Sequence, residues 1–310
     1  MSDDLFGGCW QRLDRAARHR EDGIRLWNEY LETHPYDYTV INKHDGTYVG
    51  RVIQEAPVPA ELGILIGEWL YNLRAALDNV IWATAAYVAG TIPPPKQHVL
   101  QYPIYDTEGA WTRNLYRIAG LGDHHQRMLH QMQPYKSDVD ANYLGWVNRL
   151  ARDDRHRHPN AITSYIADLR PVVALPPGAR ATLQFGDRII DNGAADCVRL
   201  TVHNWEPDLV VKINPRLGID PEVLNWSASP FWRRWDFSER LTMMEILSPA
   251  KWRCTNMTAP ATPARRISLA TNTRPSAPGA ATAWRQSTPI EVVRPSGPSP
   301  RAVGRPARRR

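Results

Sequence analysis

Residues 60–88 constrain the fold most, because they read as one long amphipathic helix. At about 100° per residue, one broad arc is mainly apolar and the opposite side is polar. The apolar arc holds Leu65, Trp69, Leu73, Ala76, Leu77, Val80, Thr84 and Val88, and the polar side holds Glu68, Asn72, Arg74, Asp78 and Asn79. A helix of this length with a buried half predicts the central helix of a helical bundle.

Further helices are expected on both sides of this central helix. Apolar residues recur every three or four positions over 10–34, which predicts a packing helix. Gly23 lies within this helix and costs about 1 kcal/mol relative to Ala. Shorter helical patterns follow at 107–117, 122–132 and 139–153.

Strand patterns occur in two parts of the chain. Segments 37–42 and 47–53 flank Asp45-Gly46, a pair that favours a tight hairpin turn because Gly accepts a positive φ. After Pro159 the chain has short segments rich in β-branched residues, separated by turn signals. These segments, which predict a small antiparallel sheet, are 161–169, 181–186, 197–203 and 208–214.

The expected fold class is α+β, in three parts. A helical bundle with the hairpin at 37–53 occupies 1–158, and a small antiparallel sheet occupies 159–250. The second part includes an aromatic cluster made of Trp226, Phe231, Trp232, Trp235 and Phe237. Residues 251–310 are rich in Pro, Ala, Ser, Thr and Arg without any period, so we expect a disordered basic tail.

The positive charge of the chain is concentrated in this tail. Residues 251–310 hold 12 of the 38 Lys and Arg but one of the 32 acids, so they carry +11 and the preceding 250 residues carry −5. A flexible arginine-rich segment is expected to bind RNA or another polyanion in a salt-dependent way. The alternative is an incidental tail, because a GC-rich gene translated out of frame gives the same residue mixture.

Several classes of protein are not indicated. The three cysteines, Cys9, Cys197 and Cys254, are far apart, so neither a disulfide framework nor a thiolate zinc site is expected. The start of the chain has early acids and no apolar run, and the central helix contains three charges, so we expect neither a secretory signal nor a membrane span. Motifs of nucleotide hydrolases, Rossmann domains, α/β-hydrolases and zincins do not occur. We therefore expect a cytoplasmic protein with no cofactor and no metal.

Two short stretches resemble a group of uncharacterised bacterial and phage proteins. Residues 72–79 read NLRAALDN, which is similar to the NLRxALDH pattern of that group. Residues 154–157 read DRHR, which is similar to its later DKHR-like segment. The resemblance covers about 10–215 by the order of elements, and it implies no particular activity.

A weaker resemblance is to HEPN domains, helical bundles found in many ribonucleases. Their signature is an Arg followed four to six residues later by a His on a long helix. The match here is Arg74, but Asn79 stands where the His is expected. The resemblance implies metal-independent RNA cleavage, in which the Arg stabilises phosphate charge and a group titrating near neutral pH moves protons. Asn79 cannot exchange a proton near pH 7, so the site is either degenerate or takes its base from elsewhere.

A second basic segment offers such a base. His156 and His158 titrate in the useful range, and Arg155 and Arg157 have the charge to hold a phosphate. The catalytic candidates are therefore Arg74, Asn79, His156 and His158, and the nucleic-acid-binding candidates are Arg74, Arg155 and Arg157. The alternative for 152–158 is a helix C-terminus whose cations complement the macrodipole.

Non-catalytic interpretations are equally open. Arg74 and Asp78 have the spacing of a surface ion pair, and Glu68, Asn72 and Arg74 have the spacing of a buried network with a neighbouring helix. The second function we consider is an interaction protein that binds a protein partner, or a second copy of itself, through the polar face of the central helix and the aromatic cluster. Catalysis requires 74–79 and 155–158 to meet in a cleft, whereas an interaction protein has them apart or covered.

Overall fold

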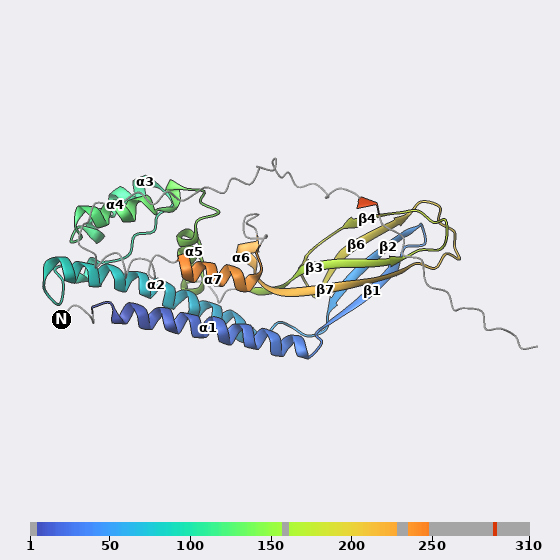
Figure 1. Ribbon diagram of the computed structural model, residues 1–310, viewed down its shortest axis with the longest axis horizontal. Coiled ribbons are helices and arrows are strands. Elements are labelled where there is room, and N and C mark those ends of the chain that lie inside the picture. The colour runs from blue at the N-terminus through green and yellow to red at the C-terminus, as the bar shows by residue number, and fades with distance from the viewer. Residues whose placement is uncertain (1–4, 157–160, 228–234, 248–287, 290–310) are drawn as a thin grey trace, which may run out of the picture.

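The computed structural model describes residues 5–156, 161–227, 235–247 and 288–289. The molecule is elongated, with helices at one end and β-sheets at the other (Figure 1). This architecture confirms the expected α+β class. The tail predicted to be disordered, 251–310, lies outside the described residues except for 288–289.

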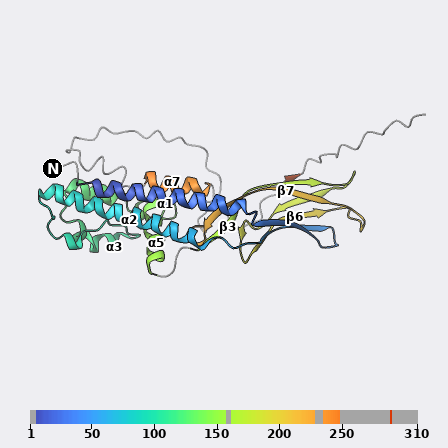
Figure 2. The same cartoon turned by 90° about the horizontal axis from the view of Figure 1, so that it is seen from below.

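Two long helices form the axis of the helical end. Helix α1 (Gly7–Glu32) and helix α2 (Ala60–Ala89) run side by side (Figure 2). The central helix predicted over 60–88 is confirmed and ends one residue later. Gly90 closes it with a φ of 65°, the left-handed conformation that glycine adopts without strain.

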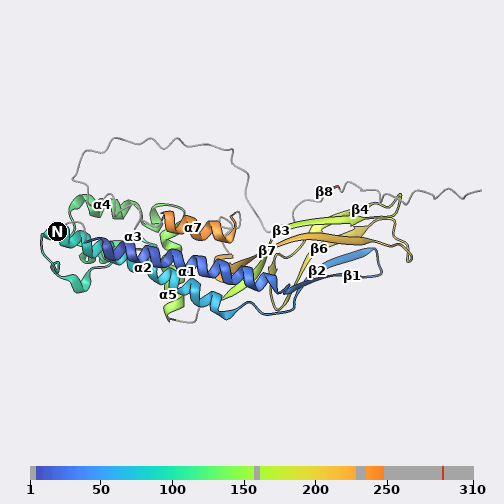
Figure 3. The same cartoon turned by 60° about the horizontal axis from the view of Figure 1, so that its bottom comes forward.

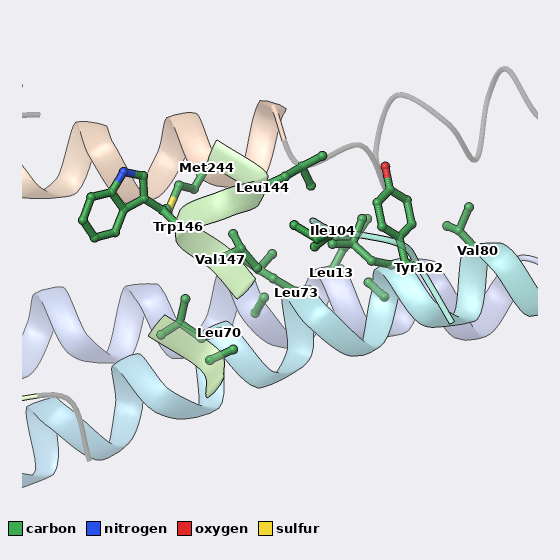
Figure 4. Close-up of a cluster of buried hydrophobic side chains, with 14 of the residues drawn as sticks. Leu13, Leu70, Leu73, Val80, Tyr102, Ile104, Leu144, Trp146, Val147 and Met244 are labelled. Atoms are coloured by element: carbon green, nitrogen blue, oxygen red, sulfur yellow. The ribbon is translucent and has the colours of Figure 1, made fainter. Parts of the chain in front are cut away.

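The buried half of α2 packs into a core shared by several helices (Figure 4). Leu70, Leu73 and Val80 of α2 have no exposed surface. They pack with α1, α5 (Tyr143–His156) and α7 (Phe237–Leu247), which contribute Leu13, Leu144, Val147 and Met244. Burying each such aliphatic side chain contributes roughly 1.5–3 kcal/mol, so this shared core is what holds the helical end together.

Shorter helices cover the rest of this end. They are α3 (Glu108–Arg113), α4 (Asp123–Gln131) and α6 (Leu224–Ser227), with single 3-10 turns η1 (Gln97–Val99), η2 (Leu115–Ile118) and η3 (Pro134–Lys136). In this region His130 stacks on Trp111, with ring centroids 4.9 Å apart.

The predicted hairpin forms but belongs to a larger sheet. Strands β1 (Tyr36–Asn42) and β2 (Thr47–Gln54) pair, and Gly46 in the turn has a φ of 87°. The sheet order is β1-β2-β6-β4-β8, which adds β6 (Ala194–Val202), β4 (Ala181–Phe185) and β8 (Thr288–Pro289). The hairpin that we grouped with 1–158 therefore shares a sheet with strands that follow residue 159.

A second antiparallel sheet has the order β5-β3-β7. Its strands are β3 (Ile162–Ala174), β5 (Ile189–Ile190) and β7 (Lys212–Val223). The long strands continue beyond the segments expected at 161–169 and 208–214, because Pro171 and Pro215 interrupt the sequence pattern but lie opposite each other in the ladder. Buried side chains of both sheets form one core, which includes Val52, Ile166 and Leu200.

After β7 the chain returns to the helical end. Trp226, Phe237 and Met244 are buried in the helical core. At the junction of the two ends, Tyr36 Oη and Ser164 Oγ share a hydrogen bond of 2.6 Å, and burial raises the pKa of Tyr36. Segments on both sides of residue 159 thus build both ends of the molecule.

Candidate functional site

Arg74 is buried and engaged in internal contacts. It is 6% exposed. Its Nη1 donates to Asp78 Oδ1 at 2.8 Å, and its Nη2 donates to the backbone carbonyl of Tyr102 at 2.9 Å. Asp78 Oδ1 also accepts the Tyr102 N–H at 2.8 Å. The Arg74–Asp78 pair is therefore present, but it anchors the loop before α3 instead of lying on the surface as one of our interpretations expected.

Burial shapes the electrostatics of this pair. Burial lowers the pKa of Arg74, and Asp78 opposes that shift. Burial raises the pKa of Asp78, and Arg74 opposes it. Each ion is thus held in its charged form mainly by the other, which is the behaviour of a structural pair.

Asn79 lies on a different side of α2 from Arg74. Its Nδ2 is 3.6 Å from the position that a Cβ on Gly8 of α1 would take. Five residues along a helix turn the side-chain direction by about 140°, so Arg74 faces the Tyr102 loop while Asn79 faces α1. The structure does not bring together these two predicted catalytic residues.

Arg155 is the member of the second basic segment that lies near Arg74. Its side chain is exposed at the end of α5. Its positive charge adds to the lowering of the pKa of Arg74, which burial mainly causes, and opposes the burial-driven rise in the pKa of Asp78. Gly67 permits the close approach of α5, because a Cβ there would lie 2.5 Å from the carboxylate oxygens of Asp154. His156 ends α5, and the His156 side chain, Arg157 and His158 lie outside the described residues.

The polar face of α2 is partly occupied by α1. His19 Nδ1 lies 3.1 Å from Glu68 Oε2, and Arg12 Nη1 donates to Asn72 Oδ1 at 3.2 Å. Glu68 and Asn72 therefore contact the neighbouring helix, as the network interpretation expected, whereas Arg74 faces the other way.

One strip of α2 between these contacts is only partly covered, with Ala75 and Trp82 half-buried and Trp82 packed against the helical core. We call it the α2 stripe, and it consists of Ile64, Tyr71, Ala75 and Trp82. At about 100° per residue, the four positions fall within about 40° of one another. Ile64 is 52% exposed and Tyr71 is 50% exposed. The guanidinium of Arg12 lies over the Tyr71 ring at 5.6 Å.

The predicted aromatic cluster is divided between core and surface. Trp226 and Phe237 are buried, Trp235 is exposed, and Phe231 and Trp232 lie outside the described residues. The guanidinium of Arg240 lies against both buried rings, at 5.1 Å from Trp226 and 5.4 Å from Phe237. The described members of this cluster therefore serve mainly as core.

Among the described residues, the most deeply buried ion pair was not predicted from the sequence. Arg240 Nη1 and Nη2 donate to the two carboxylate oxygens of Glu222, each at 2.8 Å, and the side chains are 2% and 1% exposed. The partners lie in β7 and α7, on different elements. No periodicity indicates such a contact, although the surrounding aromatic residues did mark the region.

Neither a metal-ligand cluster nor a helix suited to a membrane occurs among the described residues. Within them, no group of three or more His, Cys, Asp and Glu side chains is placed to hold a metal ion. Nor does any helix in this part of the chain combine the length and the hydrophobicity that a membrane-spanning segment needs.

Comparison with known proteins gave no relative. No family model matches the chain, no curated protein matches it, and no solved structure matches it.

Proposed function

We propose that this chain is a non-catalytic interaction protein that forms a homodimer through the α2 stripe. The observation that carries the proposal is the burial of Arg74. Its guanidinium is held by Asp78 and by the Tyr102 carbonyl, so it has poor access to a scissile phosphate. The exposed side chains of α2 are instead the kind that protein interfaces use.

The chemistry of the α2 stripe suits a second copy of the chain. Tyr and Arg are enriched at interface centres, and here Arg12 already lies against the exposed Tyr71. Both flanks of the stripe carry both signs of charge, with Arg12 and Glu68 on the α1 side and Asp78 and Arg155 on the α5 side. A face with this distribution is complementary to itself after a two-fold rotation.

Replacing Tyr71 by Glu is expected to dissociate the homodimer. The added carboxylate would be desolvated at the centre of the interface, so we expect the dimer dissociation constant to rise at least tenfold, or about 1.4 kcal/mol. Sedimentation velocity of the full chain over a concentration series measures it. Val172→Glu is the matched control, because Val172 is 52% exposed, close to the 50% of Tyr71, but lies on β3. A wild-type monomer at all concentrations, or equal dissociation of both variants, contradicts the proposal.

A second function is favoured by the position of Arg155. This exposed cation lies near enough to Arg74 to affect its pKa, so two members of the predicted nucleic-acid site share one region. We propose as the second candidate a HEPN-like domain that cleaves RNA without metal or, as a degenerate relative, only binds it. Phosphate contacts by Arg are the general means of such binding.

Reversing the charge at Arg155 tests this second function. Arg155→Glu is expected to weaken RNA binding at least tenfold and to abolish any cleavage in EDTA, because a carboxylate repels the phosphate. Full-length Arg170→Glu is the control, since it makes the same change on β3 and retains the same tail. If the two variants bind and cleave RNA alike, RNA affinity belongs to the arginine tail and not to this site.

We also propose a cytoplasmic location. Cys197 is buried and forms no disulfide, and burial raises its pKa to about 11. Unpaired thiols are the usual state in a reducing compartment.

A further inference from the structure

A cavity of about 140 Å³ lies where the helical end meets the sheets. It is lined by α1, α2, the end of β7 and the start of α7, which lie next to one another (Figure 3). The floor is apolar and buried, and consists of Trp27, Leu62, Ile66, Phe237 and Leu241. Asn28 and Ser238 also line the cavity and are exposed, so the cavity opens to solvent on their side.

The absence of a side chain at Gly23 helps to make this space. Gly23 is buried within α1 and lines the cavity. A Cβ at this position would stand 3.5 Å from Leu62 Cδ1, an ordinary contact distance. A larger side chain would therefore have to extend into the cavity. Gly23, which is unfavourable for helix formation, thus keeps part of the cavity free of side chains.

Asp220 is the acidic group in the cavity wall. Burial raises its pKa, the negative charge of Asp236 raises it further, and the Phe237 N–H, which its carboxylate accepts, opposes the shift. The two cations near it are ion-paired, Arg20 Nε with Glu245 at 2.9 Å and Arg240 with Glu222, and Arg240 also opposes the rise in the pKa of Asp220. The four acids Asp220, Asp236, Glu222 and Glu245 outnumber these two cations, which favours an added positive charge.

The volume and the lining of the cavity together indicate the size and the chemical class of its ligand. An apolar cavity of about 150 Å³ admits a single benzene ring, and Trp27 and Phe237 offer aromatic walls. We infer that this cavity binds a small aromatic or branched apolar molecule bearing one ammonium group, with the apolar part on Leu62 and Ile66 and the ammonium on Asp220. Ligand pockets commonly combine such an apolar lining with one placed charge.

Benzylamine is the probe that tests this site, with toluene and benzoate as comparisons. In calorimetric titrations of the full chain, we expect saturable one-to-one binding of benzylamine, binding of toluene at least tenfold weaker, and no binding of benzoate. Asp220→Asn is expected to weaken benzylamine at least tenfold and to leave toluene unchanged. Gly23→Leu fills the space with a good helix former and is expected to abolish binding of both.

A control variant at the sheet end shows whether an effect on benzylamine binding is specific to the cavity. Asp187→Asn removes an exposed carboxylate at the sheet end and is expected to bind benzylamine like the wild type. Absence of saturable benzylamine binding to the wild type overturns the inference. So does unchanged binding in both Asp220→Asn and Gly23→Leu, because the amine would then be held elsewhere on the surface. These outcomes are independent of whether the α2 stripe forms a dimer.

Discussion

Arg240→Met is expected to lower the free energy of unfolding by about 3–5 kcal/mol, because it leaves the Glu222 carboxylate buried without its cation. Glu222 is 1% exposed, and both of its oxygens accept from Arg240 at 2.8 Å. Water cannot replace those bonds without opening the contact between β7 and α7. Urea denaturation followed by circular dichroism measures the change.

The double variant Arg240→Met, Glu222→Leu separates charge from packing. Replacing both partners by apolar side chains removes the stranded charge, so most of the lost stability is expected to return. Met has no guanidinium to lie against Trp226 and Phe237, so the part of the loss that comes from those ring contacts is expected to remain. A double variant as unstable as Arg240→Met alone contradicts this account and assigns the loss to packing.

Patterns within a few neighbouring residues correctly predicted helix α2 and the turn between β1 and β2. The period of α2 places Leu73 and Leu77 on its buried side, and Asp45-Gly46 marks the turn between β1 and β2. Both signals depend on neighbours within a few residues. They therefore needed no knowledge of what packs on the other side.

Pairings between distant segments could not be read in the same way. Strand β2 pairs with β6, about 150 residues later, and each strand alone fits several partners. Likewise, the sequence near 226–237 does not distinguish the aromatic residues that are buried from those that are exposed. Trp226 is buried because β7 returns the chain to the helices, a consequence of topology and not of local sequence.

In the candidate site, too, local spacing predicted one contact, whereas the burial of the residues depends on distant segments. The spacing of Arg74 and Asp78 predicted their ion pair, which forms at 2.8 Å. The burial of that pair depends on the loop at Tyr102, whose sequence carries no periodic signal. Spacing also allowed Arg74 and Asn79 to share a site, but each contacts a different neighbour, the Tyr102 loop and α1 respectively.

Arg74→Met is the second large effect, with an expected loss of about 2–3 kcal/mol in the free energy of unfolding. The variant removes two hydrogen bonds from a charged donor, one to Asp78 and one to the Tyr102 carbonyl. The loss is smaller than for Arg240→Met because the Asp78 side chain is 37% exposed and keeps contact with water. Urea denaturation measures the loss, and hydrogen exchange at the Tyr102 amide reports whether the loop has loosened.

Two further variants distinguish a structural Arg74 from a ligand-binding one. Arg74→Lys is expected to lose nearly as much stability, since a single ammonium cannot reproduce the fork that bridges Asp78 and the loop. Asp78→Asn keeps an oxygen for the Tyr102 N–H but leaves Arg74, which is 6% exposed, without its counter-ion, so its loss is expected to be comparable to that of Arg74→Met. If Arg74→Met instead unfolds at the same urea concentration as the wild type and the Tyr102 amide stays protected, the guanidinium is not needed by the fold. That result would favour a role for Arg74 in ligand binding, and the RNA experiment on Arg155 would then take precedence over the dimer experiment.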